Sequence, residues 1–261
     1  MPQSSESVLS QREGQVLVVT INRPHARNAV DETTARKLGE VFRSFDRDDN
    51  LHAAILTGAE GSFCAGADLR EIGEGRRGPV DAEGTGPMGP TWLLLSKPVI
   101  AAIEGYAVAG GLELALWCDL RVAAKNAILG VFNRRWGVPL IDLGTVRLPR
   151  IVGHGRALDL ILTGRSVAAD EALQMGLVNR VTENGKALAV AKELAQSLAA
   201  FPQGGLRGDR MSAYEQWSLD WDAARRNELK RGMAAMASGE STAGAARFAS
   251  GAGRHGSFRK D

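Results

Sequence analysis

The sequence predicts an α/β protein made of repeated units of two strands and a helix. Short apolar, β-branched runs alternate with turns and with segments whose apolar residues recur at helical spacing. The 261 residues include 31 glycines, enough for many tight turns, and the chain is long enough to bury one large core. A unit of this kind buries its apolar face against the next one, so we expect the units to stack.

The composition limits the classes of function. A formal net charge of +2, with both signs mixed along the chain, argues against a dedicated nucleic-acid surface. The two cysteines and four histidines show neither a disulfide framework nor metal-ligand spacing, so no metal is expected. No apolar stretch is long enough to span a membrane, and the N-terminus does not resemble a signal peptide. We therefore expect a cytoplasmic protein without membrane contact.

Residue patterns define the elements of the first part of the chain. Residues 16–21 are apolar and β-branched and predict a strand, and residues 53–57 predict a second, buried one. Between them, Asp31 is expected to cap a helix with apolar residues at helical spacing. The stretch 73–90 is rich in glycine, proline and charge, which predicts a loop.

The rest of the chain predicts shorter elements. Residues 91–96 are expected to form a short helix that ends before Pro98, because the residue before a proline disfavours the helical region. Tyr214, Trp217 and Trp221 fall at the spacing of one apolar helix face. Strands are expected at 120–123, 127–129 and 177–181, and helices at 155–162, 168–175, 185–200 and 207–236.

The stretch 101–119 shows the strongest sign of chemistry. An apolar strand-like run breaks at Gly105, resumes, breaks again at Gly110-Gly111 and continues as a short apolar helix. Glycines at a helix start leave backbone N–H groups open to a ligand, and such donors can stabilise an oxyanion. Glu113 follows inside the apolar segment, where a carboxylate is costly unless it has a partner or a chemical task. The alternative is close packing at the glycines and a salt-bridged glutamate.

A second backbone donor is expected at Ala67, since segment 62–71 follows a strand and a turn and can open another helix. Together, the motifs FCAGADL at 63–69, KPVIAAIEGYA at 97–107 and GGLELA at 110–115 resemble the crotonase superfamily of enoyl-CoA hydratases and isomerases. The resemblance extends over roughly residues 16–200.

The resemblance implies a crotonase-like spiral of ββα units over residues 1–200, and C-terminal helices in 201–261 that associate into a trimer or a dimer of trimers. It implies an acyl-CoA thioester substrate whose carbonyl oxygen is held by the N–H groups of Ala67 and Gly110. Coenzyme A is part of that substrate, so no separate cofactor is expected. Further substrate contacts are implied at His25, Arg27, Ala65, Asp68, Leu69 and Tyr106. For His25, a solvated loop position is an equal alternative.

The resemblance also bears on the catalytic residues. Hydratases of this family use two glutamates on one water; Glu113 falls on the first position and Asn133 on the second. An amide can orient a water but cannot exchange a proton at neutral pH. The expected function, as the resemblance implies it, is an enoyl-CoA hydratase-type lyase that stabilises a thioester enolate in an oxyanion hole, and Asn133 is the departure that leaves two alternatives open. A double-bond isomerase and a non-catalytic acyl-CoA-binding protein are the alternatives.

Asp142 is the other candidate acid or base, because it is the carboxylate that lies nearest to Asn133 in the sequence. Some members of the family place an acidic catalytic group in this region. Two structural roles are equally open: a cap for the helix expected from Gly144, or a salt bridge to Arg134 or Arg135. As a catalytic group it would assist Glu113, including in the isomerase alternative.

Overall fold

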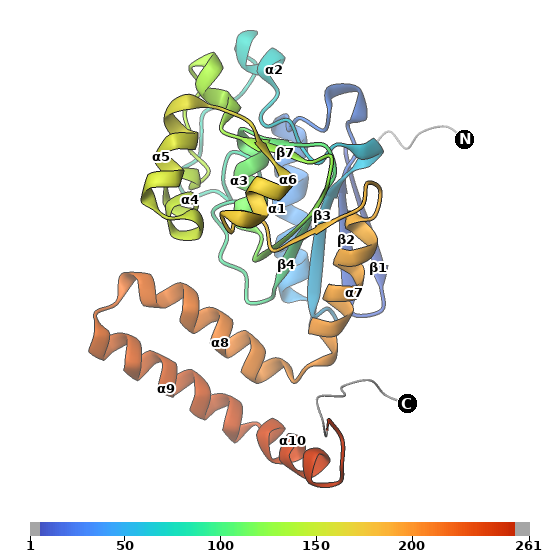
Figure 1. Ribbon diagram of the computed structural model, residues 1–261, viewed down its shortest axis with the longest axis vertical. Helices are drawn as coiled ribbons and strands as arrows, with labels where there is room; N and C mark the ends of the chain where they lie inside the picture. The colour runs from blue at the N-terminus through green and yellow to red at the C-terminus, as the bar shows by residue number, and fades with distance from the viewer. Residues whose placement is uncertain (1–5, 254–261) are drawn as a thin grey trace. The chain divides into compact units, whose positions relative to one another are not determined.

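The structure is a computed structural model that describes residues 6–253, and it divides the chain into two compact units, Met1–Ala199 and Ala200–Asp261 (Figure 1). In the first unit, a six-stranded sheet has the order β1-β2-β3-β4-β6-β9, in which β1 is antiparallel to β2 and the other pairs are parallel. A smaller sheet has the order β5-β7-β8.

The strands of the larger sheet are β1 (Val8–Glu13), β2 (Val16–Ile21), β3 (Ala53–Gly58), β4 (Val99–Ile103), β6 (Leu120–Ala124) and β9 (Arg180–Thr182). Those of the smaller sheet are β5 (Tyr106–Val108), β7 (Ile128–Gly130) and β8 (Val167–Ala168). The helices of this unit are α1 (Glu32–Arg47), α2 (Leu69–Gly73), α3 (Gly110–Trp117), α4 (Gly144–Val152), α5 (His154–Thr163), α6 (Ala169–Gln174) and α7 (Ala187–Ala200).

The two faces of the large sheet belong to two apolar clusters. On one face, α7 packs alanines at every fourth position, among them Ala187 and Ala191, against strand residues such as Val18 and Ile55. Four-residue spacing keeps the alanines on one side of the helix, and their small side chains let it approach the strands closely. The larger cluster contains the buried residues of α1 and α3, including Phe42. The functional site lies on this second side of the sheet.

Helix α1 begins where the sequence predicts it, because the side chain of Asp31 accepts a hydrogen bond from the Thr34 N–H at 2.8 Å. The strands expected at 16–21 and 53–57 and the helix at 185–200 are present within two residues of their predicted bounds. Strand β1 was not expected, because most of its side chains are partly or fully exposed and polar.

The short helix expected at 91–96 is absent, and this prediction was wrong. The backbone there bonds to distant segments: the Trp92 N–H donates to the Thr85 carbonyl at 2.8 Å, and the Ser96 N–H donates to the Asp46 carboxylate at 2.8 Å. Because these donors are used by tertiary contacts, no i to i+4 ladder forms. The preceding stretch, 74–90, has no helix or strand, as expected for a loop.

The second unit contains the helices α8 (Gln203–Glu215), α9 (Trp221–Ala237) and α10 (Glu240–Ala249); α8 and α9 lie side by side (Figure 1). Glu215 at the end of α8 accepts hydrogen bonds from Arg231 Nε and Asn227 Nδ2 of α9, both at 2.7 Å. The predicted single aromatic helix face is wrong, because α8 ends between Tyr214 and Trp217, and Trp221 begins the next helix.

Residues 254–261 lie outside the described residues. Between residues 6 and 253, none of the helices is both long enough and apolar enough to cross a membrane.

Candidate active site

A cavity of about 620 Å³ opens between the start of α3, the stretch 65–88 and the segment 132–142. Its wall is largely apolar, and three charged side chains reach it: Arg77, Glu113 and Asp142. Both carboxylates are almost fully buried, with exposed fractions of 2% and 3%. An apolar cavity with a few convergent polar groups is the usual form of a small-molecule site.

The first backbone donor at this cavity is the Gly110 N–H. Gly110 begins α3, and the preceding Ala109 has φ of 53° and ψ of −127°, a conformation that L-residues rarely adopt. The Ala109 N–H donates to the Gly130 carbonyl at 2.9 Å, which fixes this turn on β7. The Gly110 N–H itself has no acceptor among the described residues. It is therefore open to a ligand.

The second donor is the Ala67 N–H. The neighbouring groups of this stretch are bonded to Val30: the Val30 N–H donates to the Gly66 carbonyl at 2.8 Å, and the Asp68 N–H donates to the Val30 carbonyl at 3.0 Å. The Ala67 N–H between them has no acceptor in the part of the chain that the structure describes. A β-carbon on Gly66, whose φ is +101°, would lie 3.0 Å from the Gly110 nitrogen, so the two donor segments are in contact.

Glu113 lies on the first turns of α3 and faces the start of α4. Its Oε1 accepts two backbone hydrogen bonds, from the Asp142 N–H and the Gly144 N–H, each at 2.9 Å. Burial, and next the nearby charge of Asp142, raise the pKa of Glu113 to about 8, and these two hydrogen bonds oppose the shift. Glu113 therefore stays protonated at neutral pH. It forms no ion pair among the described residues, which excludes the salt-bridge alternative.

Asp142 is bound from the loop side of the cavity. Its Oδ1 accepts hydrogen bonds from the Met88 N–H at 2.9 Å and from the Thr91 hydroxyl. It does not cap α4, whose N-cap is Leu143 without a side-chain bond, and Arg134 and Arg135 donate instead to the Ile161 and Gly164 carbonyls. Both structural alternatives for Asp142 are thus wrong. Burial raises the pKa of Asp142, and the Thr91 hydroxyl is the largest influence that lowers it.

The two carboxyl groups share one arrangement. In each, one oxygen accepts two protein donors and so has both lone pairs in use. The other oxygens, Glu113 Oε2 and Asp142 Oδ2, accept no hydrogen bond from the described residues. A proton that either group carries is therefore placed on its free oxygen. The cavity thus contains two carboxyl groups that can carry a proton, and each has one oxygen that is open to a ligand.

Asn133 lines the same cavity and is 4% exposed. Its Nδ2 donates to the Val138 carbonyl at 2.9 Å, which fixes the orientation of the amide. Its Oδ1 is buried without a donor among the described residues. A buried acceptor without a partner costs about 1–3 kcal/mol, so a donor supplied by a ligand or a water would be favoured there.

The remaining predicted residues are divided between the cavity and its surroundings. Ala65 and Leu69 line the cavity. His25, Arg27 and Tyr106 do not; His25 and Arg27 are exposed, and the Arg27 guanidinium lies 5.2 Å from the centre of the Tyr106 ring.

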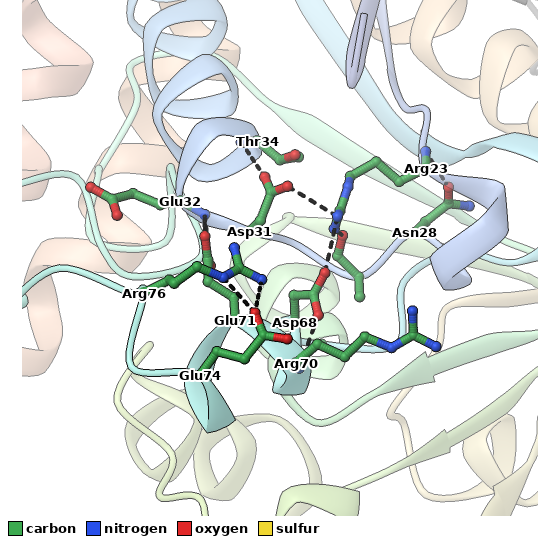
Figure 2. A network of polar contacts seen from close by, with 12 residues as sticks. Arg23, Asn28, Asp31, Glu32, Thr34, Asp68, Arg70, Glu71, Glu74 and Arg76 are labelled. Atoms are coloured by element: carbon green, nitrogen blue, oxygen red, sulfur yellow. Dashed lines mark hydrogen bonds and ion pairs between the residues drawn. The ribbon is translucent and has the colours of Figure 1, made fainter. Parts of the chain in front are cut away.

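Asp68 is engaged by the protein itself. Figure 2 shows its carboxylate between Arg23 and the start of α2: Oδ2 lies 2.9 Å from Arg23 Nη2, and Oδ1 accepts the Arg70 N–H at 3.1 Å. The same Arg23 nitrogen lies 3.0 Å from Asp31 Oδ2, at the cap of α1. Arg23 thus joins Asp31 and Asp68, the N-caps of α1 and α2, next to the Ala67 donor.

The sequence pattern did not single out Met88, Thr91, Arg77 or Arg147, all of which lie at or beside the two carboxylates. The first three belong to the loop and its end, where no periodicity exists to read. Cys64, close to the Ala67 donor in sequence, is buried, and burial raises the pKa of its thiol to about 12, so it supplies no thiolate.

These features define an enzyme site that can hold an oxyanion with two backbone donors and move protons with two carboxyl groups. The sequence model of the family described as "Enoyl-CoA hydratase/isomerase" matches residues 11–249. The chain belongs to this family. That membership confirms the predicted crotonase resemblance, the fold class and the class of acyl-CoA enzyme.

Individual relatives agree with this assignment. A short-chain-enoyl-CoA hydratase of Clostridium acetobutylicum is 42% identical over 199 residues, which cover 74% of this chain and 76% of that one. A carnitinyl-CoA dehydratase of Escherichia coli K12 is also 42% identical, over 74% of this chain and 75% of its own. The crystal structure of an enoyl-CoA hydratase from Mycobacterium tuberculosis H37Rv matches with a TM-score of 0.89 and 36% identity, over 94% of this chain and 96% of that one.

Proposed function

We propose that this protein catalyses the reversible addition of water to the double bond of a 2-enoyl-CoA thioester. The observation that carries the proposal is one cavity with two unbonded backbone donors, Ala67 and Gly110, and two buried carboxyl groups, Glu113 and Asp142. The names of the relatives agree with it.

The N–H groups of Ala67 and Gly110 hold the thioester carbonyl oxygen. Water adds to the β-carbon, and the electrons of the double bond move toward that oxygen, where negative charge develops. Donors fixed in advance at such an oxygen contribute about 2.7–4 kcal/mol each to lowering the barrier. The apolar wall of the cavity excludes bulk water and strengthens this interaction.

The two carboxyl groups divide the proton transfers. Near neutral pH Glu113 is the protonated acid, because burial and the charge of Asp142 raise its pKa to about 8. Asp142 then takes a proton from the attacking water through Oδ2, and Glu113 gives its proton to the α-carbon through Oε2. The cycle is completed when the proton on Asp142 passes to Glu113. Neither group forms a covalent bond to the substrate.

Asn133 is proposed to orient the attacking water. Its buried Oδ1 lacks a donor among the described residues, while its amide is held by the Val138 carbonyl. A water that donates to this oxygen would relieve the unpaired acceptor and keep one lone pair directed at the substrate. The role of Asn133 is thus placement, and proton transfer is left to Glu113 and Asp142.

For the coenzyme A part of the substrate, the proposed contacts outside the cavity are His25 and Arg27. Both are exposed near the donor segment: the Ala65 N–H donates to the Arg27 carbonyl at 3.1 Å. Cations at these positions suit phosphate groups. Tyr106 holds the Arg27 guanidinium by a cation–π contact.

The test is the loss of conjugated absorbance when the protein is mixed with crotonyl-CoA. The wild type is expected to hydrate it, and Glu113→Gln, which keeps the shape and removes the acid, is expected to lose about 10²–10⁴-fold in kcat. Glu104→Gln is the matched control, because the Glu104 side chain accepts the Ala187 N–H and is not among the residues that line the cavity.

Other outcomes point to other functions. Turnover of a 3-enoyl-CoA to the conjugated 2-enoyl-CoA without hydration would identify an isomerase. Tight binding of acyl-CoA with neither reaction would identify a binding protein. Either result would overturn the proposed hydration.

We also propose that the C-terminal unit mediates a trimer or a dimer of trimers. Its helix α9 exposes Leu229, Met233 and Met236 on one side, with exposed fractions of 59%, 54% and 60%. Such apolar side chains favour burial against a further surface. A monomer in sedimentation at micromolar concentration would contradict this proposal. The cytoplasmic location and the lack of a separate cofactor stay predictions.

A further inference from the structure

Thr91 is fully buried and lies at the end of the loop that closes one side of the cavity. Its hydroxyl donates to Oδ1 of Asp142, the same oxygen that accepts the Met88 N–H. A β-carbon on Gly86, whose φ is +114°, would lie 2.2 Å from the Thr91 Oγ1. The hydroxyl is thus packed against the backbone of Gly86, which leaves it little freedom to turn away from Asp142.

Arg147 of α4 joins the same two residues a second time. Its Nη1 donates to the Asp142 carbonyl at 3.0 Å, and its Nη2 donates to the Thr91 carbonyl at 2.6 Å. The guanidinium therefore holds the backbones of Thr91 and Asp142 at a fixed separation. The hydrogen bond from the Thr91 hydroxyl to Asp142 Oδ1 joins their side chains as well. This double connection ties the loop to the catalytic segment 138–142 through residues 51 positions apart.

We propose that Thr91 is a positioning residue that directs the proton of Asp142 to Oδ2, the oxygen left for the substrate water. The proposal rests on the proposed hydration, in which Asp142 is the base. With the Thr91 hydroxyl and the Met88 N–H both on Oδ1, that oxygen has no lone pair left for a proton. Without the hydroxyl, Oδ1 regains a lone pair, and the carboxylate can turn and take its proton on the wrong oxygen.

The Thr91 hydroxyl also stabilises the ionised form of Asp142. The titratable and charged groups that face Asp142 are Glu113 from α3, which is protonated near neutral pH, and the arginines Arg147 from α4 and Arg77 from the loop. The two arginines lower the pKa of Asp142, and burial raises it more strongly. Loss of the hydroxyl removes the largest lowering influence, so the pKa of Asp142 rises further.

The experiment measures kcat, KM and the pH profile of crotonyl-CoA hydration for Thr91→Val and Thr91→Ser. Thr91→Val keeps the shape and removes the hydroxyl; we expect kcat to fall about 10- to 100-fold with little change in KM, and the acid limb of the profile to move to higher pH. Thr91→Ser keeps the hydroxyl, so its kcat and the acid limb of its pH profile are expected to match those of the wild type. Thr85→Val is the matched control, because Thr85 lies on the same segment but packs on Gly39 of α1.

Two results would overturn the inference: an unchanged acid limb in Thr91→Val, or the same loss in Thr91→Ser as in Thr91→Val. If Thr91→Val does not fold, Thr91→Ala removes the hydroxyl without adding bulk and is compared in the same way. The proposed hydration fails separately, since in that case the wild type itself does not hydrate crotonyl-CoA.

Discussion

Arg23 Nη2 lies 2.9 Å from Asp68 Oδ2 and 3.0 Å from Asp31 Oδ2, so one guanidinium joins the N-terminal caps of α1 and α2 (Figure 2). Asp68 directly follows Ala67, whose N–H is a proposed oxyanion donor. The Arg23 Nη1 also donates to the Ala29 carbonyl at 2.5 Å, one residue before the bridge to Ala67. The ion pair therefore stabilises the segment that carries the donor.

The first prediction follows from this ion pair. Arg23→Met keeps most of the side-chain length and leaves two half-buried carboxylates without their cation. We expect the free energy of unfolding to fall by about 1–3 kcal/mol. Urea denaturation measures it. Arg36→Met is the matched control: Arg36 pairs with Glu40 on the exposed side of α1, and the expected change is under about 0.5 kcal/mol. Equal losses in both variants would contradict the prediction.

The second prediction concerns stability against pH. The pKa of Glu113 is raised in the folded state from 4.5 to about 8, so between these values the folded protein binds more protons than the unfolded one. The Glu113 contribution to the free energy of unfolding is therefore fully present at low pH and declines as the pH rises toward 8. Glu113→Gln removes this decline. Its stability relative to the wild type is expected to increase steadily from pH 5 to pH 8.5 in denaturant titrations; a constant difference would show that the pKa is not raised.

The site shows what sequence can and cannot predict. The donors at Ala67 and Gly110 and the burial of Glu113 follow from short local motifs, in which glycine and apolar residues surround the group concerned. The role of Asp142 could not be decided, because its partners lie 54 and 51 residues away, in a stretch without helical or strand periodicity. A local pattern cannot show which distant donors reach a side chain.

The errors in the fold have a similar cause. Residues 91–96 have helix-compatible composition, but the N–H groups of Trp92 and Ser96 bond to other segments. Between Tyr214 and Trp217 the helix ends at Glu215 with no glycine or proline to mark the break, so the spacing of aromatic residues suggested one continuous face. Tertiary contacts decide both cases, and they override the local preference.

The third prediction concerns the strained residue before Gly110. Ala109 has φ of 53°, which costs an alanine about 1–3 kcal/mol but costs glycine little. Ala109→Gly is therefore expected to leave the stability of the protein unchanged or raise it, although glycine usually costs about 0.5–1 kcal/mol. Ala189→Gly on the exposed side of α7 is the control that should show the usual loss. A larger loss in Ala109→Gly than in the control would show that Ala109 is not strained.

The last prediction separates the two carboxyl groups by pH. The wild-type profile of kcat is expected to be bell-shaped, with an acid limb from Asp142, which must be ionised, and an alkaline limb near pH 8 from Glu113, which must be protonated. Asp142→Asn removes the base and is expected to lower kcat by about 10²–10⁴-fold. It also removes the charge that helps to raise the pKa of Glu113, so the alkaline limb of the residual activity should move to lower pH.

Asp159→Asn serves as the control for Asp142→Asn, because Asp159 pairs with Arg165 on the partly exposed side of α5, outside the cavity lining. Its profile should match that of the wild type. If the alkaline limb of the Asp142→Asn profile stays at the wild-type pH, burial alone raises the pKa of Glu113, and the two groups do not act as a pair. If the alkaline limb moves to lower pH while kcat stays near the wild-type value, the charge of Asp142 raises the pKa of Glu113 but Asp142 does not act as the base.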